Sequence, residues 1–214
     1  MWALVESNNV TKVYTRPKAI TIGDVNYPSN IFMLWSSSEL EAIGIYEIVI
    51  DNSNLKDKEY YINTNQSFAF KSSVTINSID YTNVVVASYG TATAKPIDDI
   101  LFTAQDETDG LGTEGEVKQP GIRKNHISNI NAQAAGNLSP TDWLVVRAAE
   151  GGTAVPSSIT TKRAAVRTKA NAMCTQITNA ANVDALAALY VYSNTGTESD
   201  PVYTRPLGEL PTVD

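Results

Sequence analysis

Apolar and polar residues alternate through much of the first 90 positions, which is the pattern of half-buried β-strands. Residues 2–6 and 10–15 alternate on either side of a short polar turn and predict a hairpin. Residues 17–30, bounded by prolines, predict one or two short strands broken by turns. The stretch IYEIVID at 45–51 predicts another strand, and residues 59–90, rich in β-branched and aromatic side chains, predict two to four more antiparallel strands.

A single helix start interrupts these strands. A capping box and a flanking hydrophobic pair occur together, at Ser36 and Glu39 and at Trp35 and Leu40. Gly44 is expected to end this helix. We therefore expect one short helix over about 37–43, with Trp35 as a structural candidate, inside an antiparallel β-rich domain spanning residues 1–95.

After residue 121 the apolar positions recur at steps of three and four, which is the period of a helix. Residues 122–136 predict a first helix, residues 158–181 a longer one, and residues 183–190 a short final one. The sequence thus predicts an α+β protein whose C-terminal part, residues 122–193, is an antiparallel bundle of three or four helices.

Between these parts the composition changes. Residues 91–120 contain seven acidic residues against two lysines, with glycines at 110, 112 and 115. This composition favours a flexible or loosely ordered connector, placed at 96–121. The stretch from Gln105 to Glu116 has the spacing of a calcium loop, but glutamine stands at the first ligand position and Gly112 replaces an aliphatic residue. We expect a plain acidic linker and no metal.

The stretch from Leu138 to Arg167 predicts a helical hairpin. Ser139 is the expected N-cap, followed by Pro140 at the first helical position and by Asp142. The first helix should end near Glu150, before two glycines, and Pro156 should restart a second one. Trp143 stands at a staple position and is predicted to be a buried packing anchor. The charged residues form either helix-surface ion pairs or a recognition surface: Asp142, Arg147, Glu150, Arg163 and Arg167.

This hairpin sequence resembles a segment of tail-fibre and fibre-assembly proteins of tailed bacteriophages. The matching residues are Thr141-Asp142-Trp143, Arg147, Glu150, Gly152, Pro156, Ile159, Arg163, Ala165 and Arg167. The stretches MWALVESNNVTKVYTRP, YPSNIF and LWSSSELEAIGIYEIV also resemble the opening of such proteins, whereas Leu144 stands where an aromatic residue is expected. The resemblance implies a protein made in the host bacterial cytoplasm and located in the virion tail, with other tail or fibre proteins as partners and a homotrimer as the first guess. It carries no catalytic signature.

Charge and cysteine content narrow the possible partners. The formal net charge is −7 and the sequence pI is about 4.7, with no large basic patch, so nucleic acid is not an expected partner. The one cysteine, Cys174, excludes an intrachain disulfide and a cysteine metal cage, and a buried inert thiol is expected. His126 follows Arg123 and Lys124 and is expected at the surface. No signal segment and no apolar run long enough for a membrane span is visible, so neither export nor membrane insertion is expected.

A five-residue sequence, VYTRP, occurs twice, at 13–17 and at 202–206. Its candidate interaction residues are Tyr14, Arg16, Tyr203 and Arg205. Residues 194–214 are polar and proline-rich and predict an extended tail. We expect residues 200–214 of this tail to leave the helical bundle and to dock by strand pairing on a neighbouring copy or another tail protein. The alternative interpretation of the repeat is coincidence or a shared turn preference.

Three functions remain open at this point. The first is a non-enzymatic structural protein of the virion tail, a tail fibre or a baseplate or fibre-attachment component, without a cofactor. The alternative is a fibre-assembly chaperone that need not remain in the particle. A tail-associated enzyme, such as a polysaccharide depolymerase, is less favoured because no catalytic constellation and no β-solenoid repeat emerges.

Overall fold

The computed structural model describes residues 1–213, and the protein is of the mixed α+β class, as the pattern predicted. The chain divides into two compact units, Met1–Thr93 and Ala94–Asp214. The sequence placed the boundary slightly later, after residue 95, and treated the segment that follows as a connector. In the structure this segment belongs to the second unit.

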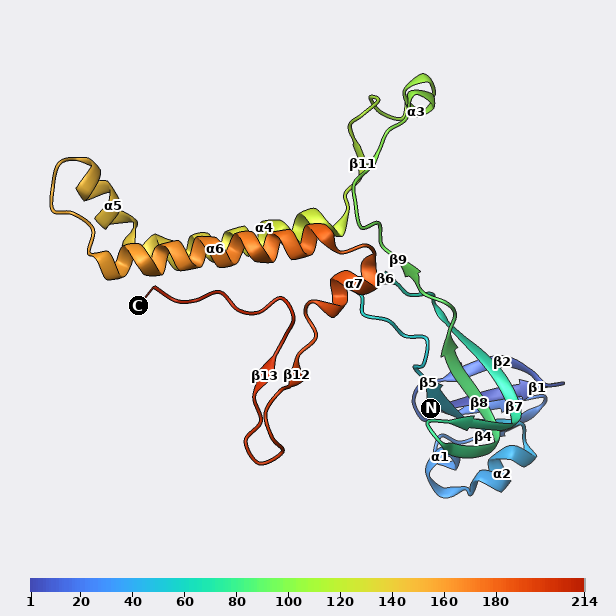
Figure 1. Ribbon diagram of the computed structural model, residues 1–214. Coiled ribbons are helices and arrows are strands. Elements are labelled where there is room, and N and C mark those ends of the chain that lie inside the picture. Colours follow the sequence, from blue (N-terminus) through green and yellow to red (C-terminus); the bar gives the residue numbers. More distant parts are fainter. Residues whose placement is uncertain (214) are drawn as a thin grey trace. The chain divides into compact units, whose positions relative to one another are not determined.

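Unit 1 is built on a five-stranded sheet of order β2-β1-β5-β8-β7 (Figure 1). Its elements are β1 (Trp2–Glu6), β2 (Asn9–Tyr14), β3 (Ile20–Ile22), β4 (Val25–Tyr27), α1 (Ile31–Leu34), α2 (Ser37–Ala42), β5 (Ile45–Asp51), β6 (Tyr61–Ile62), β7 (Gln66–Ile76) and β8 (Ile79–Tyr89). β9 (Thr93–Ala94) spans the boundary between the two units. The short strands β3 and β4 pair with each other, and β6 pairs with β9.

Two tight turns set the register of the long hairpins. Ser7 and Asn8 have φ of 52° and 65° between β1 and β2, and Asn77 and Ser78 have φ of 51° and 65° between β7 and β8. Two successive residues with positive φ are the geometry whose twist matches that of the flanking strands. The hairpin predicted over residues 2–15 is therefore confirmed.

The sheet is mixed, so the prediction of an antiparallel domain was wrong. β1 pairs antiparallel with β2 and β5, and β7 with β8, but β5 and β8 run parallel, with Ile48 opposite Val85 and Ile50 opposite Ala87. Val85 and Ala87 are fully buried in the centre of the sheet. No local signal specifies this pairing, because it joins strands more than thirty residues apart in the sequence.

The short helix α2 forms as predicted. The Ser36 N–H donates to Glu39 Oε2 at 2.7 Å and the Glu39 N–H donates to Ser36 Oγ at 3.4 Å, so both halves of the capping box are present. Gly44 follows with a φ of +80°, which an L side chain rarely adopts. Trp35 packs edge-on against Tyr27 at 5.8 Å. One helix was missed, since α1 precedes α2.

The main apolar cluster of unit 1 lies between the sheet and these two helices. Its buried members are Leu4, Tyr14, Ile20, Ile31, Phe32, Leu40 and Ile45, with Trp2 and Trp35 packed against them. The Phe32 ring of α1 packs against two aromatic rings, with centroid distances of 4.8 Å to Trp2 and 5.8 Å to Tyr14. The helices therefore serve to cover one side of the sheet.

Unit 2 is organised on two long helices that lie side by side (Figure 1). Its elements are β10 (Ile100–Leu101), α3 (Ala104–Thr108), β11 (Val117–Gln119), α4 (Ile122–Leu138), a 3-10 turn η1 (Ser139–Thr141), α5 (Asp142–Ala149), α6 (Ser157–Asn179), α7 (Val183–Ala188), β12 (Ser193–Asn194) and β13 (Tyr203–Thr204). α5 connects the end of α4 to the start of α6, so the long helices are antiparallel. The unit is built on this two-helix hairpin, with α5 and α7 as shorter helices, so the predicted three- to four-helix bundle is confirmed only in part.

The segment expected to be a loose connector has its own structure. Thr103 and Asp106 form a second capping box at the start of α3. The Lys118 ammonium lies 2.6 Å from Asp106, and with the Thr103 bonds it lowers the pKa of that carboxyl to about 2. Asp106 is therefore engaged within the segment. Among the described residues, no group of three His, Cys, Asp or Glu side chains is placed to hold a metal ion.

The C-terminal segment is also not a free tail. β12 and β13 form a small hairpin, and Leu207 after it is fully buried. The Leu207 N–H donates to the Leu189 carbonyl at 3.0 Å, and Lys169 Nζ donates to the Leu207 carbonyl at 3.0 Å. Further on, Asn137 Nδ2 donates to the Pro211 carbonyl at 3.2 Å. The described part of this segment folds back on its own helices, so the expectation that residues 200–214 leave them was wrong for the residues described, through 213.

His126 and Cys174 lie on the two long helices of unit 2. His126 is 5% exposed, with its ring centroid 4.9 Å from that of Tyr190, so the surface assignment was wrong. Its neighbours Arg123 and Lys124 suggested a solvated face, but α7 ends over it. Cys174 is half-buried, and burial raises the pKa of its thiol. Across the described residues, no helix is both long and apolar enough to span a bilayer.

Candidate interaction site

The site starts at the junction of α4 and α5, where the expected N-cap is absent. Ser139 has helical φ and ψ angles of −55° and −38°, and its Oγ donates back to the Gly136 carbonyl at 3.1 Å. The chain therefore passes from α4 through the 3-10 turn into α5 without a fresh start. Pro140 is accommodated because the first residues of a 3-10 turn need no donor.

Arg163 of α6 fixes the start of α5. Its guanidinium lies 2.7 Å from Asp142 Oδ1, and it donates to the Leu138 carbonyl at 2.7 Å and to Thr141 Oγ1 at 2.6 Å. Arg163 is only 9% exposed, so these charge-assisted bonds offset the cost of burying its cation. The ion-pair interpretation is confirmed for this pair.

Trp143 is 59% exposed, which contradicts its prediction as a buried packing anchor. Val145 and Val146 are 42% and 54% exposed, so the helix α5 buries none of its residues. The reason is that Arg163 holds only the first residue of α5, and no second layer of unit 2 covers the rest. The Arg147 guanidinium stacks on the Trp143 ring at 4.9 Å.

The loop after α5 is held close to the helix by glycine. Gly151 has a φ of +84°, and the Gly152 N–H donates to the Arg147 carbonyl at 2.9 Å. A Cβ at Gly152 would lie 2.8 Å from Arg147, so only glycine fits there.

The remaining two charged candidates, Glu150 and Arg167, do not join the ion pair of Asp142 and Arg163. Glu150 is exposed, and Arg167 lines a groove together with Val145, Val155, Thr160 and Arg163.

The four candidates of the repeated VYTRP sequence lie in separate places. Tyr14 is buried in the core of unit 1, and Arg16 is exposed. Tyr203 is 65% exposed in the β12–β13 hairpin. Arg205 pairs with Glu209 at 2.8 Å and stacks on two tyrosine rings, Tyr190 and Tyr192, at 5.5 and 5.3 Å.

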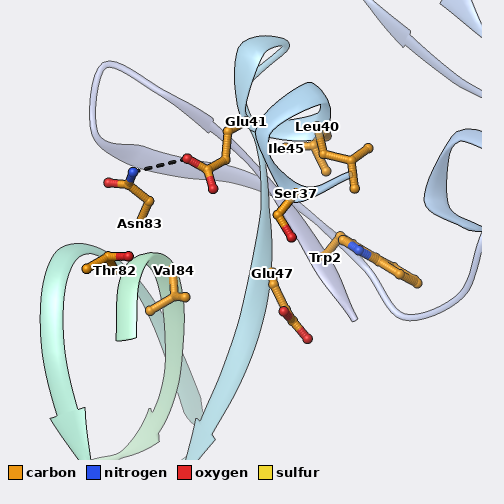
Figure 2. Close-up of a pocket in the computed structure, with 9 residues that line it drawn as sticks. All are labelled: Trp2, Ser37, Leu40, Glu41, Ile45, Glu47, Thr82, Asn83 and Val84. Atoms are coloured by element: carbon orange, nitrogen blue, oxygen red, sulfur yellow. Dashed lines mark hydrogen bonds between the residues drawn. The ribbon is translucent and has the colours of Figure 1, made fainter. Parts of the chain in front are cut away.

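Unit 1 also contains a cavity of about 90 Å³ that sequence reasoning missed (Figure 2). Its lining comes from β1, α2, β5 and β8 and comprises Trp2, Ser37, Leu40, Glu41, Ile45, Glu47, Thr82, Asn83 and Val84. Asn83, at a φ of 51°, donates from Nδ2 to Glu41 Oε2 at 3.0 Å. This volume has room for a few water molecules or the end of one side chain. Residues 42 positions apart form it, which explains why no local motif indicated it.

Comparison with family models, with curated proteins and with solved structures finds no match to this chain. Its function is therefore inferred from its own residues. Among these, the resemblance residues Asp142, Trp143, Arg147, Gly152 and Arg163 all meet around α5. These residues fix the start of α5 and the loop after it, while the apolar side chains of Trp143, Val145 and Val146 remain exposed to solvent.

Proposed function

We propose that the protein is a non-enzymatic structural component of a bacteriophage tail, in a fibre or at a baseplate or fibre attachment point, and that it acts by protein–protein assembly through α5. The observation that carries this proposal is the exposure of Trp143, Val145 and Val146 on a helix whose start is locked by Arg163. The tail assignment itself comes from the sequence resemblance.

An exposed tryptophan next to an arginine is chemically suited to a contact surface. Tryptophan and arginine are enriched among the residues that dominate binding energy at interfaces. Stacking of Arg147 on Trp143 limits the freedom of both side chains before a partner arrives. Less conformational entropy is therefore lost on binding.

The groove beside α5 extends this surface. Val145 and Val155 give it apolar walls, and Arg163 and Arg167 give it a cationic edge. Arg163 is already paired with Asp142, so Arg167 is the cation left to face a partner. A partner that combines an apolar side chain with a carboxylate matches this combination.

The test is incorporation into particles. Phage particles carrying the wild-type chain or Trp143→Ala with Val146→Ser are purified on a density gradient, and the chain is quantified against a capsid protein by mass spectrometry. We expect stoichiometric wild-type chain and a loss of about tenfold or more for the variant. The control replaces Val25, which is 52% exposed in unit 1, with serine and should incorporate normally.

Two other results contradict the proposal in distinct ways. Absence of the wild-type chain from particles that need it for fibre attachment indicates the chaperone function instead. Equal incorporation of the α5 variant and wild type shows that α5 is not the assembly surface.

A further inference from the structure

The two ends of unit 2 carry opposite charge and exposed apolar side chains. We propose that the acidic end of one molecule docks on the α5 end of a second copy of the same chain. The acidic end is residues 103–117, named the acidic knob below, and the α5 end is residues 142–167. This inference rests on the proposed use of α5 as a contact surface and names its partner.

The acidic knob has five carboxylates and no basic residue. Asp106 is engaged by Lys118, but Glu107, Asp109, Glu114 and Glu116 are exposed and have no ion pair within the described chain. No cation among the described residues neutralises these four side chains. A binding surface for a cation-bearing partner is therefore left open.

The acidic knob is also preformed and has an apolar apex. Leu111 is 61% exposed, and its N–H donates to the Asp106 carbonyl at 2.9 Å. The Phe102 N–H donates to the Glu116 carbonyl at 2.9 Å, and the Phe102 ring lies against Gly112 so closely that a Cβ there would be 2.5 Å from it. A leucine on a structured loop can bind without ordering the loop first.

The α5 end offers the complement. It contains four basic residues, Arg147, Lys162, Arg163 and Arg167, against two acidic ones in a chain whose net charge is −7. Asp142 is already paired with Arg163, which leaves Arg147, Lys162 and Arg167 for an acidic partner. The exposed side chains of Trp143, Val145 and Val146 surround the site where Leu111 would pack.

These two surfaces cannot meet within one molecule. The acidic knob precedes the start of α4, anchored there by the Gly121 N–H, which donates to Asp99 Oδ1 at 2.8 Å, and by the Arg123–Asp98 ion pair at 2.8 Å. α5 follows the other end of α4. A helix of 17 residues is about 25 Å long, roughly three Debye lengths at physiological salt. The complementary charges therefore act between molecules.

Such a contact joins two different surfaces, so it is head-to-tail and continues into a ring or a chain of molecules. This predicts a specific behaviour in solution. Sedimentation velocity of the full chain at about 10 to 200 µM should show concentration-dependent association. The association should weaken when salt is raised from about 0.05 to 0.5 M, because the exposed charges are screened.

Two variants, one for each surface, test the assignment. Trp143→Ala with Arg147→Glu removes the α5 surface, and Leu111→Ser with Glu114→Lys removes the acidic knob; each should weaken association by about thirtyfold or more. All four positions lie outside the core, and circular dichroism verifies the fold. Val25→Ser with Asp24→Lys, a matched change in unit 1, should associate like wild type.

Mixing the two variants gives the decisive result. Each retains one intact surface, so the mixture should form a one-to-one dimer and nothing larger. A wild-type chain that stays monomeric at 200 µM in low salt overturns the inference, as does a knob variant that associates normally. Neither result affects the proposed tail function, because incorporation into particles is measured separately.

Discussion

The same five residues, VYTRP, occupy two regions of this protein and play opposite parts in them. At 13–17 the tyrosine is buried, with Tyr14 at 1% exposure in the core of unit 1. At 202–206 the tyrosine is in solvent, with Tyr203 at 65% exposure. β2 belongs to a five-stranded sheet covered by helices, whereas β13 has only a two-residue partner strand. Burial is decided by what the rest of the chain brings to a segment.

The two arginines of the repeat show the opposite pattern of contacts to the two tyrosines. Arg16 is exposed and forms no ion pair with the described residues. Arg205, in contrast, lies between two tyrosine rings and a carboxylate, and Leu207 two residues later is fully buried. The first copy is thus held by its tyrosine and the second by its arginine and the leucine that follows. Single substitutions can separate these contributions.

The largest difference is expected between the two tyrosines. Tyr14→Ala should lower the free energy of unfolding of unit 1 by about 3 to 5 kcal/mol, because it leaves a cavity beside Phe32. Tyr203→Ala should change that of unit 2 by about 0.5 kcal/mol or less, since its side chain is solvated. Urea unfolding followed by tryptophan fluorescence and by circular dichroism measures both. Equal effects would contradict the comparison.

Leu207→Ala should have the next largest effect and lower the free energy of unfolding of unit 2 by about 2 to 4 kcal/mol. The residue is fully buried against the end of α7, where its backbone bonds to Leu189. The helical signal at 222 nm during urea unfolding reports on α4 and α6. Leu111→Ala, which removes an exposed leucine from the same unit, is the control and should unfold at the wild-type urea concentration.

Arg205→Ala should lower the free energy of unfolding of unit 2 by about 1 kcal/mol, which is the sum expected from a partly exposed ion pair and ring stacking. Arg16→Ala should have no measurable effect. Thermal unfolding of the two variants at low and high salt checks this assignment. A destabilisation by Arg205→Ala that is the same at both salt concentrations would mean that packing on the rings outweighs the ion pair with Glu209.

Tyr14→Phe should have a much smaller effect at neutral pH than Tyr14→Ala. The Tyr14 hydroxyl is buried and has no hydrogen-bond partner among the described residues, so removing it should be neutral or stabilise unit 1 by up to about 1 kcal/mol.

The same variant tests the pH dependence. Burial, and secondarily the charge of Glu6, raises the pKa of Tyr14 above its ordinary value of 10.0. The unfolded chain therefore loses this proton first, and the stability contributed by the neutral phenol, complete below pH 10.0, is lost as pH rises through the folded pKa. Wild type should lose more stability than Tyr14→Phe between pH 9 and about 11.

Local patterns predicted those elements whose cause is local. The capping box of Ser36 and Glu39 set α2, the polar turn set the first hairpin, and Pro156 marked the start of α6. The parallel pairing of β5 with β8 and the burial of His126 under Tyr190 had no such cause. Both depend on residues brought from far along the chain.

The candidate site was predicted in its members but not in its geometry. Asp142 and Arg163 were expected to form ion pairs and do, while Trp143 was expected inside and lies outside. A staple position predicts contact only when a neighbouring layer exists to receive the side chain. The acidic knob was missed because its glycines and carboxylates are typical of a linker, although Thr103 and Asp106 fold it.

The parallel pair in unit 1 also bears on how the protein is made. A ribosome synthesises β1, β2 and β5 well before β8, whose residues 85–88 pair with β5. Until then one edge of β5, with Ile48 and Ile50, has no neighbouring strand. Closure of the sheet is a late step between distant residues, and such steps fold slowly. A nascent chain that stops before residue 85 therefore presents an open strand edge to any other strand nearby.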